Sequence, residues 1–182
     1  QIMAACEKTL GYSGVSCPPA TAGMTQVVYM ANLNDISSWT AGTTGWYSDV
    51  TMKAGKGLYR MEIKKDSGRF HETLQGAEES LGSYDQDYEA MIASMSIGAR
   101  NAVDDSNGPD LVIFAPSKSQ EVFIIGKDLG ARMVENEGDT NQDAYGERII
   151  FRATQMREKR VHLLDTDYDT TIALLESLVI AS

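Results

Sequence analysis

The chain has 182 residues and a formal net charge of −10, which fits one domain large enough to bury a core without disulfides or metals. Its Asp and Glu residues are spread along the sequence, so we expect a solvated acidic surface that repels nucleic-acid phosphates and anionic lipid. No apolar run approaches the roughly 18 residues of a membrane-spanning helix, and no basic-then-apolar segment opens the chain, which predicts neither membrane contact nor targeting.

Residues 1–24 form a segment of different composition from the rest. They are rich in Gly, Ser, Ala and Thr, and Pro18 and Pro19 cannot donate backbone hydrogen bonds, so we expect an extended arm. The domain proper is then expected over residues 25–182. Both cysteines, Cys6 and Cys17, lie in the arm; two thiols are too few for a disulfide framework, and no C-x-x-C pair indicates zinc.

Strand-like patterns dominate the first half of the domain. Thr25–Leu33 is rich in β-branched and aromatic residues and predicts a strand, whereas the Ser, Gly and Thr content of Asn32–Asp49 predicts a long loop. Residues 57–65 alternate apolar and polar side chains, as a half-buried antiparallel strand does. A turn at Asp66–Gly68 then predicts a hairpin with residues 69–76.

The second half is expected to alternate between strands and two helices. We expect a strand to about Met91, a helix to about Val103, and two short buried strands around a turn at Pro116–Gln120. Residues 126–155 predict a hairpin with an acidic tip at Gly138–Ala144, and Arg148–Leu164 one long strand. The resulting fold class is mainly β, with sandwich-like or barrel-like antiparallel sheets, one flanking helix and a C-terminal helix, or α+β by content.

The C-terminal residues change to a helical period. Ile172, Leu175 and Val179 recur at helical spacing, and Asp169 stands where an N-cap belongs. The same stretch contains Asp165, Asp167, Asp169 and Glu176 at the spacing of a calcium-binding loop. Against calcium, Thr170 occupies the position that needs Gly, so the acids are better explained as complements of the helix dipole.

Other candidate residues carry weaker chemical signals. His71 and His162 lie in strand-like segments without a catalytic motif, and Ser117-Lys118 lacks the further elements of a serine/lysine pair, so we expect no catalytic residue and no cofactor. The remaining charged groups predict solvated turns or ion-pair partners rather than metal or nucleic-acid sites; they are Asp104, Asp105, Glu135, Glu137, Asp139, Asp143 and the basic run Met156–Arg160.

The order of elements in residues 108–164 resembles the C-terminal half of tail tube proteins of long-tailed bacteriophages, particularly phages of Bacteroidetes. The shared pattern is a helix, a short strand, a strand ending in "IIGKDLG", an acidic hairpin tip and a strand like "AYGERIIFRATQ". A weaker likeness reaches back to residues 57–76, so the resemblance covers roughly two thirds of the chain. The N-terminal arm and the C-terminal helix lie outside it.

The resemblance implies a structural virion protein rather than an enzyme. It implies a β-sandwich flanked by a helix, and homo-oligomeric, six-membered rings that stack into a tube for DNA passage, assembled in the bacterial cytoplasm. Tape-measure and tail-terminator proteins are the implied partners, with transient, non-specific contact to DNA. Two alternatives stay open: another virion component, such as a head-to-tail connector or capsid-associated protein, and a calcium-stabilised extracellular β-domain.

Overall fold

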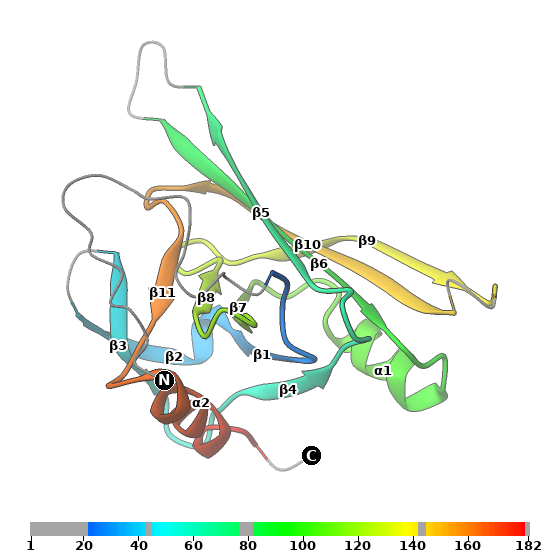
Figure 1. The fold of residues 1–182 in the computed structure, drawn as a ribbon, viewed down its shortest axis with the longest axis horizontal. Coiled ribbons are helices and arrows are strands. Elements are labelled where there is room, and N and C mark those ends of the chain that lie inside the picture. The colour runs from blue at the N-terminus through cyan, green and yellow to red at the C-terminus, as the bar shows by residue number, and fades with distance from the viewer. Residues whose placement is uncertain (1–21, 43–44, 77–81, 142–144, 181–182) are drawn as a thin grey trace, which may run out of the picture.

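A computed structural model describes residues 22–42, 45–76, 82–141 and 145–180, which fold into two stacked β-sheets and two α-helices (Figure 1). The mainly-β class expected from the sequence is confirmed. Cys6, Cys17 and nearly all of the expected arm lie outside the described residues. The last residue of that arm, Met24, is 6 % exposed and forms an antiparallel bridge with Ser117, so this residue packs with the domain.

The larger sheet has seven strands in the order β2-β3-β11-β8-β7-β1-β4. Its strands are β1 (Val27–Asn32), β2 (Ile36–Ala41), β3 (Trp46–Met52), β4 (Tyr59–Glu62), β7 (Leu111–Pro116), β8 (Val122–Ile125) and β11 (Val161–Leu163). A short 3-10 helix, η1 (Leu33–Asp35), joins β1 to β2. The sheet is mixed, because β11 runs parallel to β3.

The smaller sheet has four strands, all antiparallel, in the order β5-β6-β10-β9. Its strands are β5 (Arg69–Gln75), β6 (Ser83–Ile92), β9 (Arg132–Asp139) and β10 (Gly146–Met156). The β5–β6 and β9–β10 hairpins extend beyond the body of the molecule in different directions (Figure 1). Helix α1 (Ile97–Asp105) follows β6, and its N-cap Ser96 accepts a hydrogen bond from the Ala99 N–H.

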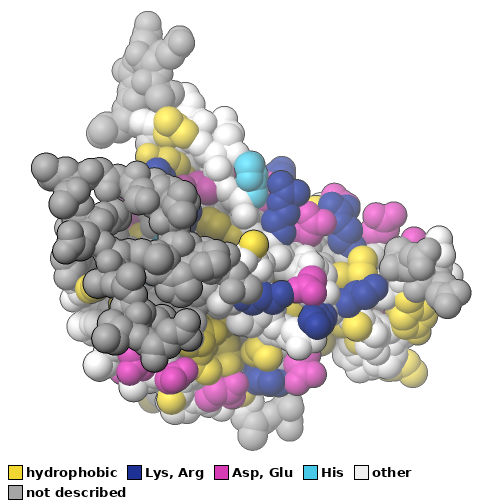
Figure 2. Space-filling view, viewed as in Figure 1, with side chains coloured by type: hydrophobic (Ala, Val, Ile, Leu, Met, Phe, Trp, Pro, Cys, Tyr) yellow, Lys and Arg dark blue, Asp and Glu magenta, His cyan; other side chains and the backbone are white. Residues whose placement is uncertain are grey.

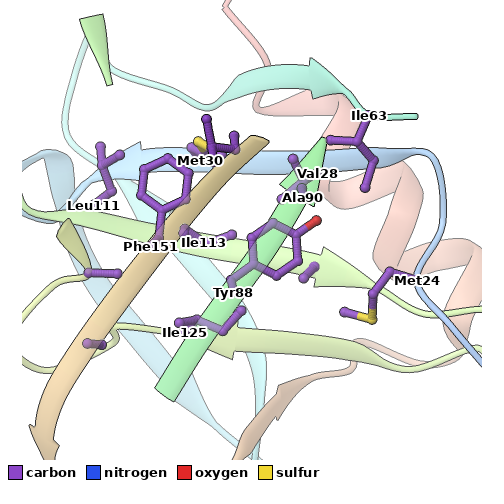
Figure 3. Packing of buried hydrophobic residues seen from close by; sticks show 14 of the residues in the cluster. Met24, Val28, Met30, Ile63, Tyr88, Ala90, Leu111, Ile113, Ile125 and Phe151 are labelled. Carbon is purple, nitrogen blue, oxygen red and sulfur yellow. The ribbon is translucent and has the colours of Figure 1, made fainter. Parts of the chain in front are cut away.

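One hydrophobic core lies between the two sheets. Tyr88 and Phe151 of the small sheet point towards Met30, Ile113 and Ile125 of the large sheet (Figure 3). Alternate residues of β6 and β10 face this core and the others face outward, as the period of a strand requires.

A second core lies on the opposite face of the seven-stranded sheet, under helix α2 (Tyr168–Ser177). Phe114 of β7 and Leu175 of α2, both 0 % exposed, belong to it. Because β7 contributes to both cores, all six of its residues are buried, which explains the continuous apolar run of its sequence. The layers are therefore small sheet, large sheet and α2.

The hairpin predicted from residues 57–76 is wrong. The two strands exist, but β4 pairs with β1 in the large sheet and β5 pairs with β6 in the small one. The turn at Lys65 and Asp66 carries the chain between sheets, and the Lys64 N–H already donates to the Met91 carbonyl of β6. Period-two alternation identifies a strand but not its partner, and here Ile63 is buried whereas Tyr59 is 53 % exposed.

The long loop predicted at Asn32–Asp49 is also wrong, because β2 and β3 pair there as an antiparallel hairpin. The Ser and Thr residues that suggested a loop lie on the exposed positions of an edge strand. Trp39 anchors β2, with its ring centroid 5.5 Å from that of Tyr47 and 5.8 Å from that of Phe114.

The long strand predicted at Arg148–Leu164 is two strands in different sheets. A turn over residues 157–160 separates β10 from β11, after a left-handed backbone at Gln155 (φ 59°). The C-terminal helix is confirmed, but its N-cap is Asp167 and not Asp169. The Asp167 carboxylate accepts the Thr170 N–H at 2.8 Å, and the Thr170 hydroxyl accepts the Asp167 N–H at 3.0 Å, which forms a capping box.

Candidate assembly surface

The two edges of the four-stranded sheet are long and exposed. Within the described residues, neither β5 nor β9 has a hydrogen-bonded neighbour on its outer side. Seven of the eight β9 residues, all but Met133, are exposed, and Leu74 of β5 is 50 % exposed. Such edges present a row of N–H and C=O groups to any strand that reaches them.

The edge strands of the seven-stranded sheet, β2 and β4, are shorter than β5 and β9. Immediately before β4, the C-terminal segment lies alongside Leu58, whose N–H donates to the Leu178 carbonyl at 2.8 Å and whose carbonyl accepts the Ile180 N–H at 3.0 Å. At β2, the register shifts twice along its pairing with β3, which breaks the regular edge. Among the described residues, the small sheet therefore has the longer exposed edges.

The outward face of the small sheet carries paired charges. Arg148 donates to Glu89 at 2.7 Å and also pairs with Glu135, and Arg152 donates to both oxygens of Asp87 at 2.7 and 2.9 Å. The hydrogen bond to Glu89 raises the pKa of Arg148, and that to Asp87 raises the pKa of Arg152. Figure 2 shows basic and acidic side chains next to one another over this part of the molecule.

By strand alternation, six carboxylates and four guanidinium groups share this face. They are Asp85, Asp87, Glu89, Glu135, Glu137, Asp139, Arg69, Arg132, Arg148 and Arg152. The face is therefore slightly negative and largely neutralised within itself, rather than uniformly acidic.

The acidic stretch of residues 126–155 is a hairpin, as predicted. Gly138 lies within β9 and not in the connecting tip, and residues 142–144, with Asp143, lie outside the described part. Glu137 and Asp139 are exposed and make no ion pair with any described residue; the Asp139 carboxylate accepts the Asn141 N–H at 2.8 Å. Asp104 is held by Arg100 at 3.6 Å at the end of α1, where Asp105 is exposed.

A groove of about 710 Å³ lies between the described ends of β2 and β3, residues 41–42 and 45–47, and residues 158–161. Trp46, Tyr47 and Gly42 line one side, and Lys159 and Arg160 line the other. The basic run was predicted to lie on a strand and to pair with acidic neighbours, but it forms a turn, and its Arg157, Lys159 and Arg160 make no ion pair among the described residues.

The two histidines lie in strands, as predicted, and in different surroundings. His71 is exposed on β5, with Nε2 3.0 Å from the Thr73 hydroxyl. His162 of β11 lies against Phe123, with ring centroids 4.9 Å apart, and burial lowers its pKa although Glu121 at 4.0 Å opposes the shift.

Ser117 and Lys118 belong to the β7–β8 turn. The Ser117 hydroxyl lies 2.9 Å from that of Ser119 and accepts the Glu121 N–H at 3.2 Å. The Lys118 ammonium forms an ion pair with Asp66, and this contact lowers the pKa of the Asp66 carboxyl. Both side chains thus stabilise turns and do not face each other as a catalytic pair.

The residues with calcium-loop spacing do not converge on one point. Asp167 caps α2, and its bonds from Thr170 lower its pKa. Glu176 lies on the last turn of the helix, where it accepts the Tyr29 hydroxyl at 2.6 Å and pairs with Arg60 at 3.3 Å. Among the described residues, no three His, Cys, Asp or Glu side chains cluster closely enough to hold a metal ion.

Comparison of the chain with protein-family models, with curated proteins and with solved structures finds no match. Neither α1 nor α2, the helices of the described part, has the length and apolar character that crossing a membrane requires. The exposed residues Arg69 and Leu74 of β5 were not singled out in the sequence. A large apolar side chain near the end of an otherwise polar strand is the signal that could have identified them.

Proposed function

We propose that the protein is a structural subunit that assembles with copies of itself into rings, which stack into a tube like that of a phage tail. The observation that carries this proposal is the four-stranded antiparallel sheet with both edges exposed. An edge can be blunted, covered or paired, and closure into a ring through head-to-tail contacts pairs every edge at once.

The strand directions of this sheet suit such a ring. In the order β5-β6-β10-β9 each strand is antiparallel to the next, so β5 and β9 run in opposite directions. Rotation about an axis along the sheet places β5 of a second copy beside β9 of the first, again antiparallel. An even number of strands in each copy therefore continues the alternation around a closed barrel, and a head-to-tail interface that closes leaves no edge.

The face that would line the bore is the charged face, because the other face is covered by the large sheet. Six copies give 24 strands. At about 4.8 Å between strands and a tilt of about 36°, the backbone ring is about 45 Å across, which leaves an open channel. The four arginines of the face are outnumbered by carboxylates, and Arg148 and Arg152 are already paired. DNA would release few counterions on contact and would be held weakly.

Negative-stain microscopy of the concentrated full-length protein tests the proposal. We expect rings with a central hole, and tubes at higher concentration. Analytical ultracentrifugation of the same samples should give one discrete oligomer below the tube-forming concentration. A single monomeric species at all concentrations would contradict the proposal. Closed rings that never stack would instead favour the head-to-tail connector among the roles considered.

A further inference from the structure

The two edge strands of the small sheet, β5 and β9, are displaced relative to each other along the strand direction, as the pairing registers show. β5 lies opposite residues 83–89 of β6, from Gln75 at one end to Arg69 at the other. β9, followed through β10, runs from Arg132, level with Asp87 of β6, to Gly138, level with Ile92, and Asp139 lies one position further on. The two edges are therefore offset by four residues across four strands, which is one residue per strand.

This offset is the stagger that a closed barrel needs. Eight strands with a shear of eight, also one residue per strand, tilt by about 36° and close. The same ratio holds for any number of identical four-stranded units. With that stagger, a second copy rotated about the barrel axis presents the whole of its β5 to the whole of β9.

Resting on the proposed ring, we infer that β5 of one copy pairs with β9 of the next in a single register that sets Arg69 opposite Asp139. The same register sets His71 opposite Glu137 and Thr73 opposite Glu135. Because Val134 is an extra residue where the β9–β10 register shifts, Leu74 comes opposite Met133. The partner is thus a second copy of this chain, recognised by strand pairing and by its side chains.

The side chains that meet in this register are complementary. Arg69 and Asp139 are exposed, and neither forms an ion pair with another described residue, so each would gain a partner of opposite charge. His71 and Glu137 are likewise exposed. On the inward side, Leu74, 50 % exposed, would be covered by Met133, which is already half-buried against the core. Opposite charges and apolar pairs directly across strands stabilise the pairing.

A shift of two residues in either direction loses these matches. In one direction Arg69 would face Glu137 and Asp139 would lose its basic partner; in the other direction Arg69 would face Asn141. Either shift would also move Leu74 away from Met133. A shift of one residue would place polar outward side chains against the apolar inward ones, since strand faces alternate. The register is therefore specified by both faces of the edge.

Disulfide trapping tests the register directly. In a Cys6→Ser, Cys17→Ser background, His71→Cys is combined in turn with Glu135→Cys, Glu137→Cys or Asp139→Cys, and assembled protein is oxidised. Directly opposite Cβ atoms lie about 5 Å apart and diagonal ones about 7–8 Å, so we expect the Glu137→Cys pair to give a ladder of cross-linked oligomers on denaturing gels. The two other pairs should give little more than monomer.

Charge exchange gives an independent readout. Arg69→Asp and Asp139→Arg should each reduce ring formation at micromolar concentrations, and the two together should restore it. Lys53→Asp and Asp105→Arg are the matched controls, because they change the charge equally at exposed positions away from both edges. They should assemble as the unmodified chain does.

The outcomes separate this inference from the function it rests on. The inferred register would be wrong if rings cross-linked best through Glu135→Cys or Asp139→Cys. It would also be wrong if Arg69→Asp and Asp139→Arg left ring formation unchanged. In both cases the proposed ring itself would still hold. Absence of any oligomer of the unmodified chain would overturn both.

Discussion

At the scale of single residues, the most informative titratable group is His162. It packs against Phe123 in β11 with a quarter of its side chain exposed, and burial lowers its pKa from the usual 6.5. The nearby groups oppose one another, because Glu121 and Glu72 raise this pKa and Arg160 lowers it. The folded protein therefore binds a proton at His162 less readily than the unfolded chain does.

The sign of the resulting pH dependence follows from linkage. Below the unfolded-state value of 6.5 the unfolded chain takes up the proton first, so the stability associated with neutral His162 is lost as the pH falls through the lower, folded-state pKa. We expect the melting temperature to fall between about pH 7.5 and pH 5 by less in His162→Gln than in the unmodified protein. Differential scanning calorimetry at both pH values measures this.

His71→Gln is the matched control, because His71 is exposed on β5. It should keep the pH dependence of the unmodified protein. An equal fall in melting temperature for His162→Gln and the unmodified protein would mean that His162 titrates alike in both states. The measurement is made at concentrations below assembly, because oligomerisation itself raises the melting temperature.

At the scale of elements, helix α2 covers the second core, and Leu175 is its fully buried apolar side chain there. Leu175 is 0 % exposed and packs among residues of the large sheet, beside the buried Thr171. Leu175→Asp would place an unpaired carboxylate there, and we expect a loss of about 3 kcal/mol or more in the free energy of unfolding. Urea titration followed by circular dichroism measures it.

Ala173→Asp introduces the same charge on the exposed face of the same helix. It should lower the free energy of unfolding by no more than about 1 kcal/mol, from helix propensity alone. Equal effects of the two variants would show that α2 does not cover the core.

The sequence predicted most of the strands and helices, but it did not predict which strands pair with one another. Strand alternation, the Pro116–Gln120 turn and the helical period around Leu175 follow from local chemistry, and the structure confirms all three. The pairing of β4 with β1 instead of β5, and the division of residues 148–164 between two sheets, depend on contacts between distant segments. A local pattern has no information about which sheet a strand joins.

At the scale of the whole molecule, the candidate surface shows the same division. The sequence predicted the acidic hairpin of residues 126–155, but the proposed pairing of its β9 strand with β5 depends on the positions of both strands along one sheet. Arg69 and Asp139 are ordinary exposed residues until that sheet is formed. The long loop predicted at Asn32–Asp49 is instead a hairpin of the large sheet.

The sharing of β7 between the two cores predicts that the layers unfold together. Ile113 packs between the sheets and Phe114 packs under α2, so a substitution that loosens the packing of either core also loosens β7. Ile113→Ala should lower the free energy of unfolding by about 2–5 kcal/mol.

Two probes measure this unfolding in a Trp46→Phe background. One is the fluorescence of Trp39, which contacts Phe114 in the other core, and the second is far-UV circular dichroism. We expect both probes to give the same lowered urea midpoint and the same slope as in the parent. Had the cores been independent, the Trp39 signal would keep the midpoint of the parent while the circular dichroism split into two transitions. The coincidence of both probes, at concentrations below assembly, therefore measures whether the three layers form one cooperative unit.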